Sequence, residues 1–208
     1  MIPALVVTGT DTDVGKTVFA AALAGALDAH YWKPVQAGLD GGSDSERIAA
    51  LSGLQPDRIL AEAYRLTSPC SPHRAAKLDG VAIYPEHLTL PALPRSLVIE
   101  GAGGALVPLN DHLLFADLFA CWNAPVVIVA RTTLGTINHS LLTIEALRNR
   151  GVPILGIAFI GEAQEDSEQT IARLSKVRRL GRLPILDPLN RGTLARAFAA
   201  SFTLTDFQ

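Results

Sequence analysis

The segment with the clearest capacity for chemistry is the glycine-rich loop at residues 9–17, which reads GTDTDVGKT. An apolar stretch typical of a strand precedes it and an alanine-rich stretch typical of a helix follows it. This is the context in which such a loop binds phosphate. Backbone N–H groups of the loop and of the helix N-terminus converge on an anion, and the helix dipole strengthens the attraction. In such a loop Lys16 contacts the β- and γ-phosphates and the Thr17 hydroxyl ligates Mg²⁺.

The loop is a variant of the common phosphate-binding loop. The usual spacing places the first glycine at position 10, where this chain has Thr10, and the glycine comes one residue earlier at Gly9. The alternative, a glycine-rich turn with an exposed lysine, is disfavoured by the flanking strand and helix. The loop therefore predicts bound nucleotide phosphates, but it does not name a reaction.

Two carboxylates stand where phosphoryl transfer needs metal ligands. Glu100 ends an apolar stretch and begins the segment EGAGG at residues 100–104, and open α/β sheets bind ligands at the carboxyl ends of their strands. The alternative for Glu100 is to cap a helix or face solvent. Asp44 follows Ser43, which forms a capping-box pattern with Glu46. The helix dipole stabilises an acidic residue in a first turn without any metal, so both interpretations of Asp44 stay open.

Three further groups have both a chemical and a structural interpretation. Lys33 lies toward the end of a predicted strand, and it either points into the crevice above the sheet or is a solvated surface lysine. His139 lies near the start of a predicted helix, where packing is favoured over general-base catalysis because no triad-like arrangement accompanies it. The basic segment KVRR at residues 176–179 fits a helix C-terminus, which favours positive charge, better than a patch that binds nucleic acid.

The elements that must position these residues alternate along the chain, with short runs of Val, Ile and Leu between longer stretches of helical period. Continuously apolar runs suit strands buried on both faces of a parallel sheet, and strand–helix alternation produces βαβ crossovers. The predicted strands are residues 4–8, 31–35, 97–100, 126–130 and 154–160. The predicted helices are residues 16–27, 44–51, 115–122, 137–149, 167–178 and 193–199. We predict an α/β fold of the P-loop NTPase type, with a mostly parallel central sheet and helices on both faces.

Residues 55–94 differ from the rest of the chain. They hold six of the 13 prolines and no clear strand. We expect an irregular excursion over the edge of the sheet that carries short helices, rather than a second domain. A chain of 208 residues fits one domain over residues 1–208, at about 100–200 residues per domain.

Composition excludes several classes of protein. The 18 Lys and Arg residues against 20 Asp and Glu give a formal charge of −2, whereas nucleic-acid-binding modules carry a basic excess. No apolar run approaches the ~20 residues of a membrane span, and no leader pattern begins the chain. Cys70 and Cys121 lack disulfide or metal-ligand spacing, so we expect buried or half-buried free thiols in a reducing compartment. We predict a soluble, cytoplasmic protein that binds neither nucleic acid nor membrane.

Five motifs follow one another in a characteristic order. They are VTGTDTDVGKT at residues 7–17, KPV at 33–35, SPH at 71–73, EGAGG at 100–104 and INH at 137–139. In type and order they resemble the motifs of the ATP-dependent dethiobiotin synthetase family, and the first, fourth and fifth together are highly specific. The last quarter of the chain matches in pattern but hardly in residues.

The resemblance implies a reaction of 7,8-diaminononanoate, CO₂ and MgATP that yields dethiobiotin, ADP and phosphate. An amine of the substrate captures CO₂ as a carbamate, and ATP then phosphorylates the carbamate. The second amine closes the ureido ring as phosphate leaves. Mg²⁺ and the co-substrate ATP are therefore the implied cofactors.

The resemblance also implies roles for individual residues. Lys16, Lys33 and Thr12 are the implied catalytic residues, with the two lysines beside the carbamate and γ-phosphate. The implied Mg²⁺ ligands are Thr17, Asp44 and Glu100. The implied nucleotide contacts are Asp13, Val14, Gly15, Lys16, Thr17, Val18, Asp44, Glu100, Gly101, Ala102, Gly103, Pro184, Ile185 and Leu186. The implied diamine contacts are Thr12, Ala37, Gly135, Thr136, Ile137 and Asn138. A homodimer is implied as well, in which residues 135–138 of one subunit hold the substrate carboxylate in the site of the other.

The chain departs from the family pattern at three places. Ala37 stands where the family usually has a hydroxyl residue that contacts substrate. Ile160 and Gly161 stand where the family often has an Asn-Asp pair that recognises adenine. The segment that follows residues 183–185 is short.

Other functions remain as alternatives. The first is a nucleotide-switch ATPase of the partition or septum-site type, but these carry a lysine five residues before the loop lysine, where this chain has Asp11. The second is an amidotransferase-like synthetase acting on corrin precursors, which needs a glutaminase domain for which 208 residues leave no room. A non-catalytic binding module is disfavoured, because it does not need so many charged residues directed into a crevice.

Overall fold

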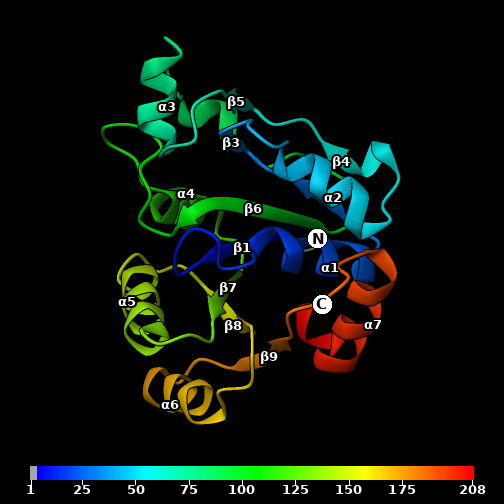
Figure 1. The fold of residues 1–208 in the computed structure, drawn as a ribbon. Coiled ribbons are helices and arrows are strands. Elements are labelled where there is room, and N and C mark those ends of the chain that lie inside the picture. Colours follow the sequence, from blue (N-terminus) through cyan, green and yellow to red (C-terminus); the bar gives the residue numbers. More distant parts are fainter. Residues whose placement is uncertain (1–3) are drawn as a thin grey trace.

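The computed structural model describes residues 4–208, which form an α/β fold around one parallel sheet (Figure 1). Its seven strands lie in the order β4-β2-β6-β1-β7-β8-β9. They are β1 (Ala4–Gly9), β2 (His30–Trp32), β4 (Ile59–Leu60), β6 (Leu97–Gly104), β7 (Val126–Arg131), β8 (Ile154–Ile160) and β9 (Arg179–Leu183). Each pairing in this sheet is parallel, as continuously apolar strands predict.

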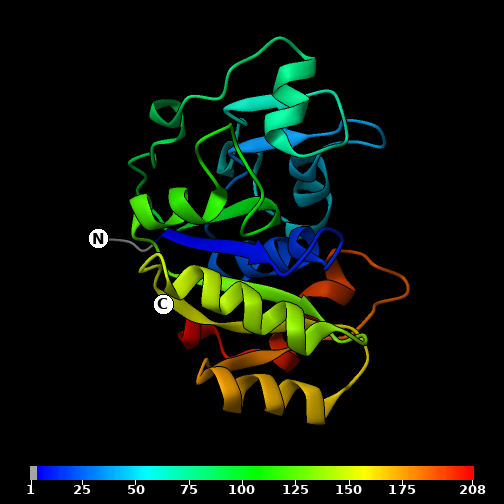
Figure 2. The same ribbon diagram turned by 90° about the vertical axis from the view of Figure 1, so that its left-hand side faces the viewer.

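Helices cover both faces of the sheet. They are α1 (Lys16–Leu27), α2 (Asp44–Ser52), α3 (Pro72–Leu78), α4 (Phe115–Trp122), α5 (Thr136–Arg148), α6 (Glu165–Ser175) and α7 (Arg191–Ser201). Neighbouring residues of β1 enter opposite core layers, Val6 with α4, α5 and α6, and Val7 with α1, α2 and α7. The α4–α6 layer faces the viewer in Figure 2. The predicted α/β class with a parallel sheet between helices is confirmed.

The predicted strand at residues 31–35 is wrong, because two strands replace it. β2 ends at Trp32, and β3 (Val35–Ala37) pairs with β5 (Tyr64–Leu66) in a separate two-stranded sheet. Pro34 lies between them and has no N–H to donate to a ladder. Lys33 therefore occupies a break between two sheets, and this break aims its side chain into the molecule.

The expectation of no strand in residues 55–94 is also wrong. β4 pairs with β2 at the edge of the main sheet, and β5 forms the small sheet with β3. With two and three residues, these strands are too short for a visible alternation of apolar side chains. The predicted short helices are present, as α3 and the 3-10 helices at Pro56–Arg58 and Pro85–Leu88.

The strand β9 was not predicted, and the helix before it ends earlier than the predicted residue 178. Helix α6 stops at Ser175, and Lys176 adopts a left-handed conformation with φ 54° as its C-cap. Arg179 and Arg182 lie within β9 and pair with the buried Glu168 of α6. Charged residues are common on edge strands, but they obscure the apolar pattern by which strands are predicted.

The N-terminal cap of α2 lies where the sequence predicts it. The capping box of α2 is confirmed, because Ser43 Oγ accepts from the Glu46 N–H while Glu46 Oε2 accepts from the Ser43 N–H.

Cys70 and Cys121 are free but exposed, so the expectation of buried or half-buried thiols is wrong. Within residues 4–208 no helix has the length and apolarity needed to cross a bilayer.

Candidate active site

The phosphate-binding loop joins the central strand β1 to α1. Asp13 and Gly15 adopt left-handed backbone conformations, with φ of 55° and 92°. Such angles suit glycine and turn the loop sharply into the first turn of α1. Lys16 begins this helix and its Nζ donates to the Asp11 carbonyl oxygen at 2.8 Å. Burial, assisted by the nearby positive charge of Lys33, lowers the pKa of Lys16 to about 8.

Thr17, Asp44 and Glu100 come together from three elements. Thr17 lies in the first turn of α1, Asp44 begins α2 and Glu100 lies in β6. Thr17 Oγ1 is 2.8 Å from Glu100 Oε1 and 3.1 Å from Asp44 Oδ1. Asp44 lies in the first turn of α2, where the helix dipole favours it, and it also belongs to this cluster. Glu100 is fully buried, so it neither caps a helix nor faces solvent.

These three oxygen ligands fit part of a Mg²⁺ site. In proteins Mg²⁺ is usually held by one or two carboxylates together with water and substrate phosphates. Residues 4–208 contain no cluster of three or more His, Cys, Asp and Glu side chains suited to a metal. Thr17, Asp44 and Glu100 would therefore supply part of the coordination shell of Mg²⁺, and substrate phosphates would complete it.

Lys33 is the second cation of the cluster, and it is only 2% exposed, so the surface interpretation is wrong. Its Nζ lies 2.6 Å from Asp44 Oδ2 and 3.1 Å from Glu100 Oε1. It also donates to the Gly101 carbonyl oxygen at 2.9 Å. Burial on its own lowers the pKa of Lys33, but the carboxylates of Glu100 and Asp44 outweigh burial and raise it above its ordinary value. Lys33 therefore stays cationic.

Two adjoining hollows meet at the loop. The first, of about 770 Å³ and here called the phosphate hollow, is lined by all the predicted catalytic and metal-binding residues, by two of the predicted substrate contacts and by several predicted nucleotide contacts. They are Thr12, Asp13, Gly15, Lys16, Thr17, Val18, Lys33, Ala37, Asp44, Glu100, Ala102 and Gly103. The second, of about 580 Å³ and here called the apolar hollow, shares Asp13, Gly15 and Val18 with it.

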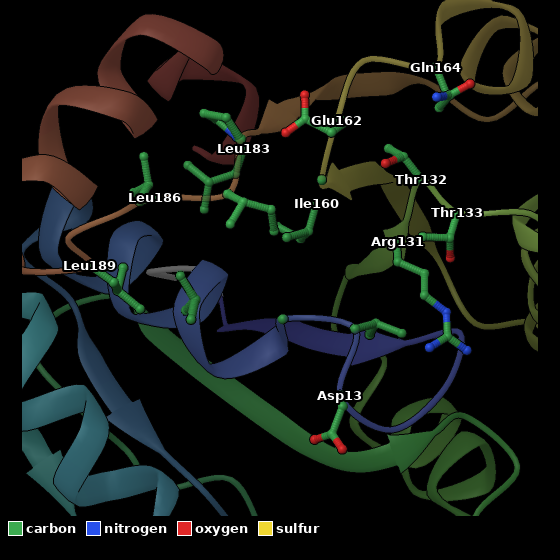
Figure 3. A pocket seen from close by; sticks show the side chains of 16 residues that line it. Asp13, Arg131, Thr132, Thr133, Ile160, Glu162, Gln164, Leu183, Leu186 and Leu189 are labelled. Atoms are coloured by element: carbon green, nitrogen blue, oxygen red, sulfur yellow. The ribbon is translucent and has the colours of Figure 1, made fainter.

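The apolar hollow lies beyond the loop, at the carboxyl ends of β8 and β9 (Figure 3). It includes the predicted nucleotide contacts Val14, Pro184, Ile185 and Leu186. Ile160, Gly161, Leu183, Leu189, Thr132 and Arg131 also line it, and Glu162 and Gln164 follow β8 along its margin. An apolar slot beside phosphate-binding groups suits a nucleoside.

Four predicted substrate contacts lie outside both hollows. Gly135, Thr136, Ile137 and Asn138 begin α5 and line neither of them, and Gly135 and Asn138 are exposed. His139 is exposed and lines neither hollow, so the structure gives it no catalytic partner among the described residues. Gly101 also lines neither hollow and contributes through its carbonyl contact with Lys33.

Two residues of the site carry no signal in the sequence. Tyr31 of β2 is fully buried, and its hydroxyl donates to Glu100 Oε2 at 2.8 Å. Burial and the negative charge of Glu100 raise the pKa of Tyr31 well above its ordinary value, so the hydroxyl keeps its proton. Gln36 Oε1 accepts from the Asp44 N–H at 3.1 Å. Both belong to apolar strand stretches, and no sequence pattern marked them as polar partners.

A strand–loop–helix phosphate site at the carboxyl ends of a parallel sheet defines a P-loop nucleotide-binding protein. A family model described as an AAA domain matches residues 3–193. The ATP-dependent dethiobiotin synthetases of Rhizorhabdus wittichii and Rhodopseudomonas palustris are 67% and 64% identical to this chain, over 100% of it and 99% of each relative. The chain belongs to the ATP-dependent dethiobiotin synthetase family, a family of ligases of biotin biosynthesis.

Two solved structures with a similar fold share far less sequence with this chain. A plasmid partition protein from Borrelia burgdorferi gives a TM-score of 0.59 at 13% identity, over 100% of this chain and 98% of that one. The septum site-determining protein MinD of Pyrococcus horikoshii, solved with Mg-ADP, gives 0.56 at 15% identity, over 95% and 86%. At these identities the likeness concerns the fold alone, so it does not favour the nucleotide-switch alternative.

Proposed function

We propose that this chain converts 7,8-diaminononanoate, CO₂ and ATP into dethiobiotin, ADP and phosphate, with Mg²⁺ bound at the phosphates. The observation that carries the proposal is the convergence of Lys16, Thr17, Lys33, Asp44 and Glu100 in one hollow beside the loop. Family membership supplies the identity of the substrate, and the hollow supplies groups with the charge that this chemistry needs.

In the proposed reaction one amine of the diamine attacks CO₂ and loses a proton, which leaves a carbamate. A carbamate oxygen attacks the γ-phosphorus of ATP, and ADP departs. The second amine then attacks the carbamate carbon, the ureido ring closes, and phosphate leaves with the second amine proton passing to solvent. Negative charge builds on the phosphoryl oxygens during the transfer, and fixed cations beside them lower the barrier.

Each residue of the phosphate hollow takes a role in this proposal. Lys16 and Lys33 hold the transferring phosphoryl group and the carbamate, and Thr12 contacts the diamine. Thr17, Asp44 and Glu100 hold Mg²⁺, which supplies positive charge that neutralises the phosphate oxygens. Backbone N–H groups of the loop, from Asp13 to Val18, bind the phosphates, with Gly101, Ala102 and Gly103 beside them. The nucleoside occupies the apolar hollow against Pro184, Ile185 and Leu186.

The substrate site is proposed to be completed by a second subunit. Gly135, Thr136, Ile137 and Asn138 begin a helix, where backbone N–H groups suit a carboxylate, yet they line neither hollow of their own chain. In a homodimer they would hold the carboxylate tail of the diamine in the partner's site, and Ala37 would line the diamine path within this chain. We further propose that the chain works as a single synthetase domain, located in the cytoplasm.

The test is phosphate release from the purified protein, with mass spectrometry of the product. We expect release only when diamine, bicarbonate and MgATP are all present, together with one dethiobiotin per phosphate. Rapid ATP hydrolysis without diamine, stimulated by DNA or lipid, would contradict the proposal and favour the nucleotide-switch alternative.

A further inference from the structure

The two carboxylate oxygens of Glu100 have different partners. Oε1 faces the cluster, 2.8 Å from Thr17 Oγ1 and 3.1 Å from Lys33 Nζ. Oε2 accepts a hydrogen bond from the Tyr31 hydroxyl at 2.8 Å. Glu100 and Tyr31 are both 0% exposed, so bulk water does not compete for Oε2 and the two oxygens are not equivalent.

The sheet holds Tyr31 where it can make this contact. Tyr31 lies opposite Val98 of β6 on one side and Ile59 of β4 on the other. Glu100 comes two residues after Val98, and residues two apart in a strand share one face of the sheet. The ring of Tyr31 belongs to the apolar core layer that includes α1 and α2. The phenol is therefore a rigid donor with little freedom to leave Glu100.

A carboxylate with one oxygen engaged by an O–H group presents only its other oxygen to a cation. Mg²⁺ demands near-ideal octahedral geometry and takes its carboxylates together with water and phosphate. Ca²⁺ accepts six to eight oxygens at longer distances and often takes both oxygens of one carboxylate. The partner of Oε2 thus bears directly on which cation the site prefers.

We propose that Tyr31 is a specificity-determining positioning residue, which restricts Glu100 to a single ligating oxygen and so favours Mg²⁺ over Ca²⁺. The inference rests on the proposed function, in which Glu100 is a ligand of the nucleotide-bound cation. Tyr31 lies outside the family motifs, and the inference gives it the role of selecting Mg²⁺ over Ca²⁺.

The test compares ADP binding in the presence of Mg²⁺ and of Ca²⁺, by calorimetry on the full chain. Tyr31→Phe keeps the ring and removes the hydroxyl, which frees Oε2. We expect the ratio of the two ADP affinities to move toward Ca²⁺ by about tenfold, the scale at which partners of metal ligands alter metal affinity. A general loss of stability would weaken both complexes alike and leave the ratio unchanged.

Tyr64→Phe is the matched control. Tyr64 is also buried, but its hydroxyl lies 2.9 Å from His87 Nδ1, whereas that of Tyr31 donates to Glu100. We expect its variant to keep the wild-type ratio. A Tyr31→Phe ratio equal to wild type would overturn the inference alone, whereas wild-type ADP binding that ignores divalent cations would overturn the proposed Mg²⁺ site as well.

A second measurement needs no variant. In a crystal structure of the wild-type protein with Ca²⁺ and ADP, we expect one oxygen of Glu100 on the cation and the other still bonded to Tyr31. Both oxygens on the cation, with the phenol displaced, would overturn the inference.

Discussion

Lys16 and Lys33 are both buried in the phosphate hollow, but their surroundings shift their pKa values in opposite directions. The pKa of Lys16 falls to about 8, because burial and the charge of Lys33 disfavour its cationic form. The pKa of Lys33 rises, because Glu100 and Asp44 outweigh its burial. One lysine is thus a fixed cation, while the other can lose its charge within an accessible pH range.

The lowered pKa of Lys16 predicts a pH-dependent affinity for nucleotide. Lys16 is charged below about pH 8 and neutral above it, so the affinity for ADP should fall as the pH rises through that value. The dissociation constant should rise by up to about tenfold per pH unit. Calorimetry between pH 7 and 9.5 measures it. Lys16→Arg keeps its charge and should give a flat profile, and a flat wild-type profile would contradict the assigned pKa.

Removal of Lys33 should affect both activity and stability. Lys33→Ala is expected to lower turnover by about 10² or more, the scale of a lost charge partner in the transition state. It also leaves Glu100 buried without its cation, at a cost of about 3–5 kcal/mol, which urea unfolding measures. Lys77→Ala, on the exposed face of α3, should change neither. Full turnover of Lys33→Ala would refute its assigned role.

At the scale of elements, the carboxyl ends of β8 and β9 form the apolar hollow, which is lined by Ile160 and Gly161. Ile160 ends β8, and Gly161 follows with φ 130°. A Cβ at Gly161 would lie 2.4 Å from Thr132 Oγ1. The packing of Thr132 therefore keeps this position glycine, and no side-chain amide stands there to recognise a base.

This arrangement predicts weak discrimination between nucleotides. Positions 160 and 161 carry no amide group, and the amide of Gln164 lies at the margin of the hollow. We therefore expect the hollow to select mainly by fit against apolar side chains. We expect kcat/KM values for ATP, GTP and CTP to differ by no more than about tenfold, the equivalent of one hydrogen bond of 1.4 kcal/mol. A panel of nucleoside triphosphates in the coupled reaction measures this, and a preference for ATP above a hundredfold would contradict it.

Helix α6 is bound to the edge strand β9 through one buried carboxylate. Glu168 is 0% exposed, and its oxygens lie 2.6 Å from Arg179 Nη2 and 3.6 Å from Arg182 Nε. Arg182 in turn donates to the Gly161 carbonyl oxygen at 2.8 Å. The network therefore extends to the floor of the apolar hollow.

Loss of this carboxylate should destabilise the fold. Glu168→Ala removes a buried carboxylate from two half-exposed arginines and is expected to cost about 1.5–3 kcal/mol of unfolding free energy, the scale of a hydrogen bond to a charged group. Glu165→Ala removes an exposed carboxylate on the same helix, 3.6 Å from Arg179 Nη2, and an exposed pair of this kind should cost less than about 1 kcal/mol. Urea unfolding of both variants measures the difference, and equal effects would show that the Glu168 pairs add no net stability.

At the scale of the whole molecule, the first turn of α5 is separate from the chemistry it is proposed to serve. Leu134 precedes this turn and is fully exposed, and Gly135 and Asn138 are exposed beside it. A fully exposed apolar side chain beside the N-terminus of a helix suits contact with a second copy, because closed dimers use the same patch on both subunits.

Subunit mixing tests the dimer. Lys16→Ala disables the loop, and Asn138→Trp blocks the first turn of α5, so each variant alone should be inactive. A mixed dimer contains one site with an intact loop and an intact α5 turn. Random mixing should therefore restore about a quarter of wild-type sites, measured as dethiobiotin formed. No recovery, together with a monomer in sedimentation at working concentration, would contradict the shared site.

Much of the architecture and most of the site were accessible from residues alone. The loop at residues 9–17 and Glu100 carry local signals, because a strand, a sharp turn and a helix N-terminus are fixed by residues close in sequence. The strand predicted to end at Glu100 continues as β6 to Gly104. The elements that escaped have no such signal. β4 and β5 are too short to show an alternation of apolar and polar residues. β9 contains arginines whose partner, Glu168, belongs to another element, so its sequence does not look like that of a strand.

The sequence by itself determined the parallel α/β fold, the phosphate loop and the family to which the chain belongs. Only the tertiary structure decided the environment of each charged group. Lys33 is buried rather than solvated because Pro34 breaks the strand and two distant carboxylates receive its charge. Tyr31 meets Glu100 across 69 positions of sequence. Burial and charge pairing depend on which elements the fold brings side by side, and a linear pattern of residues does not record that.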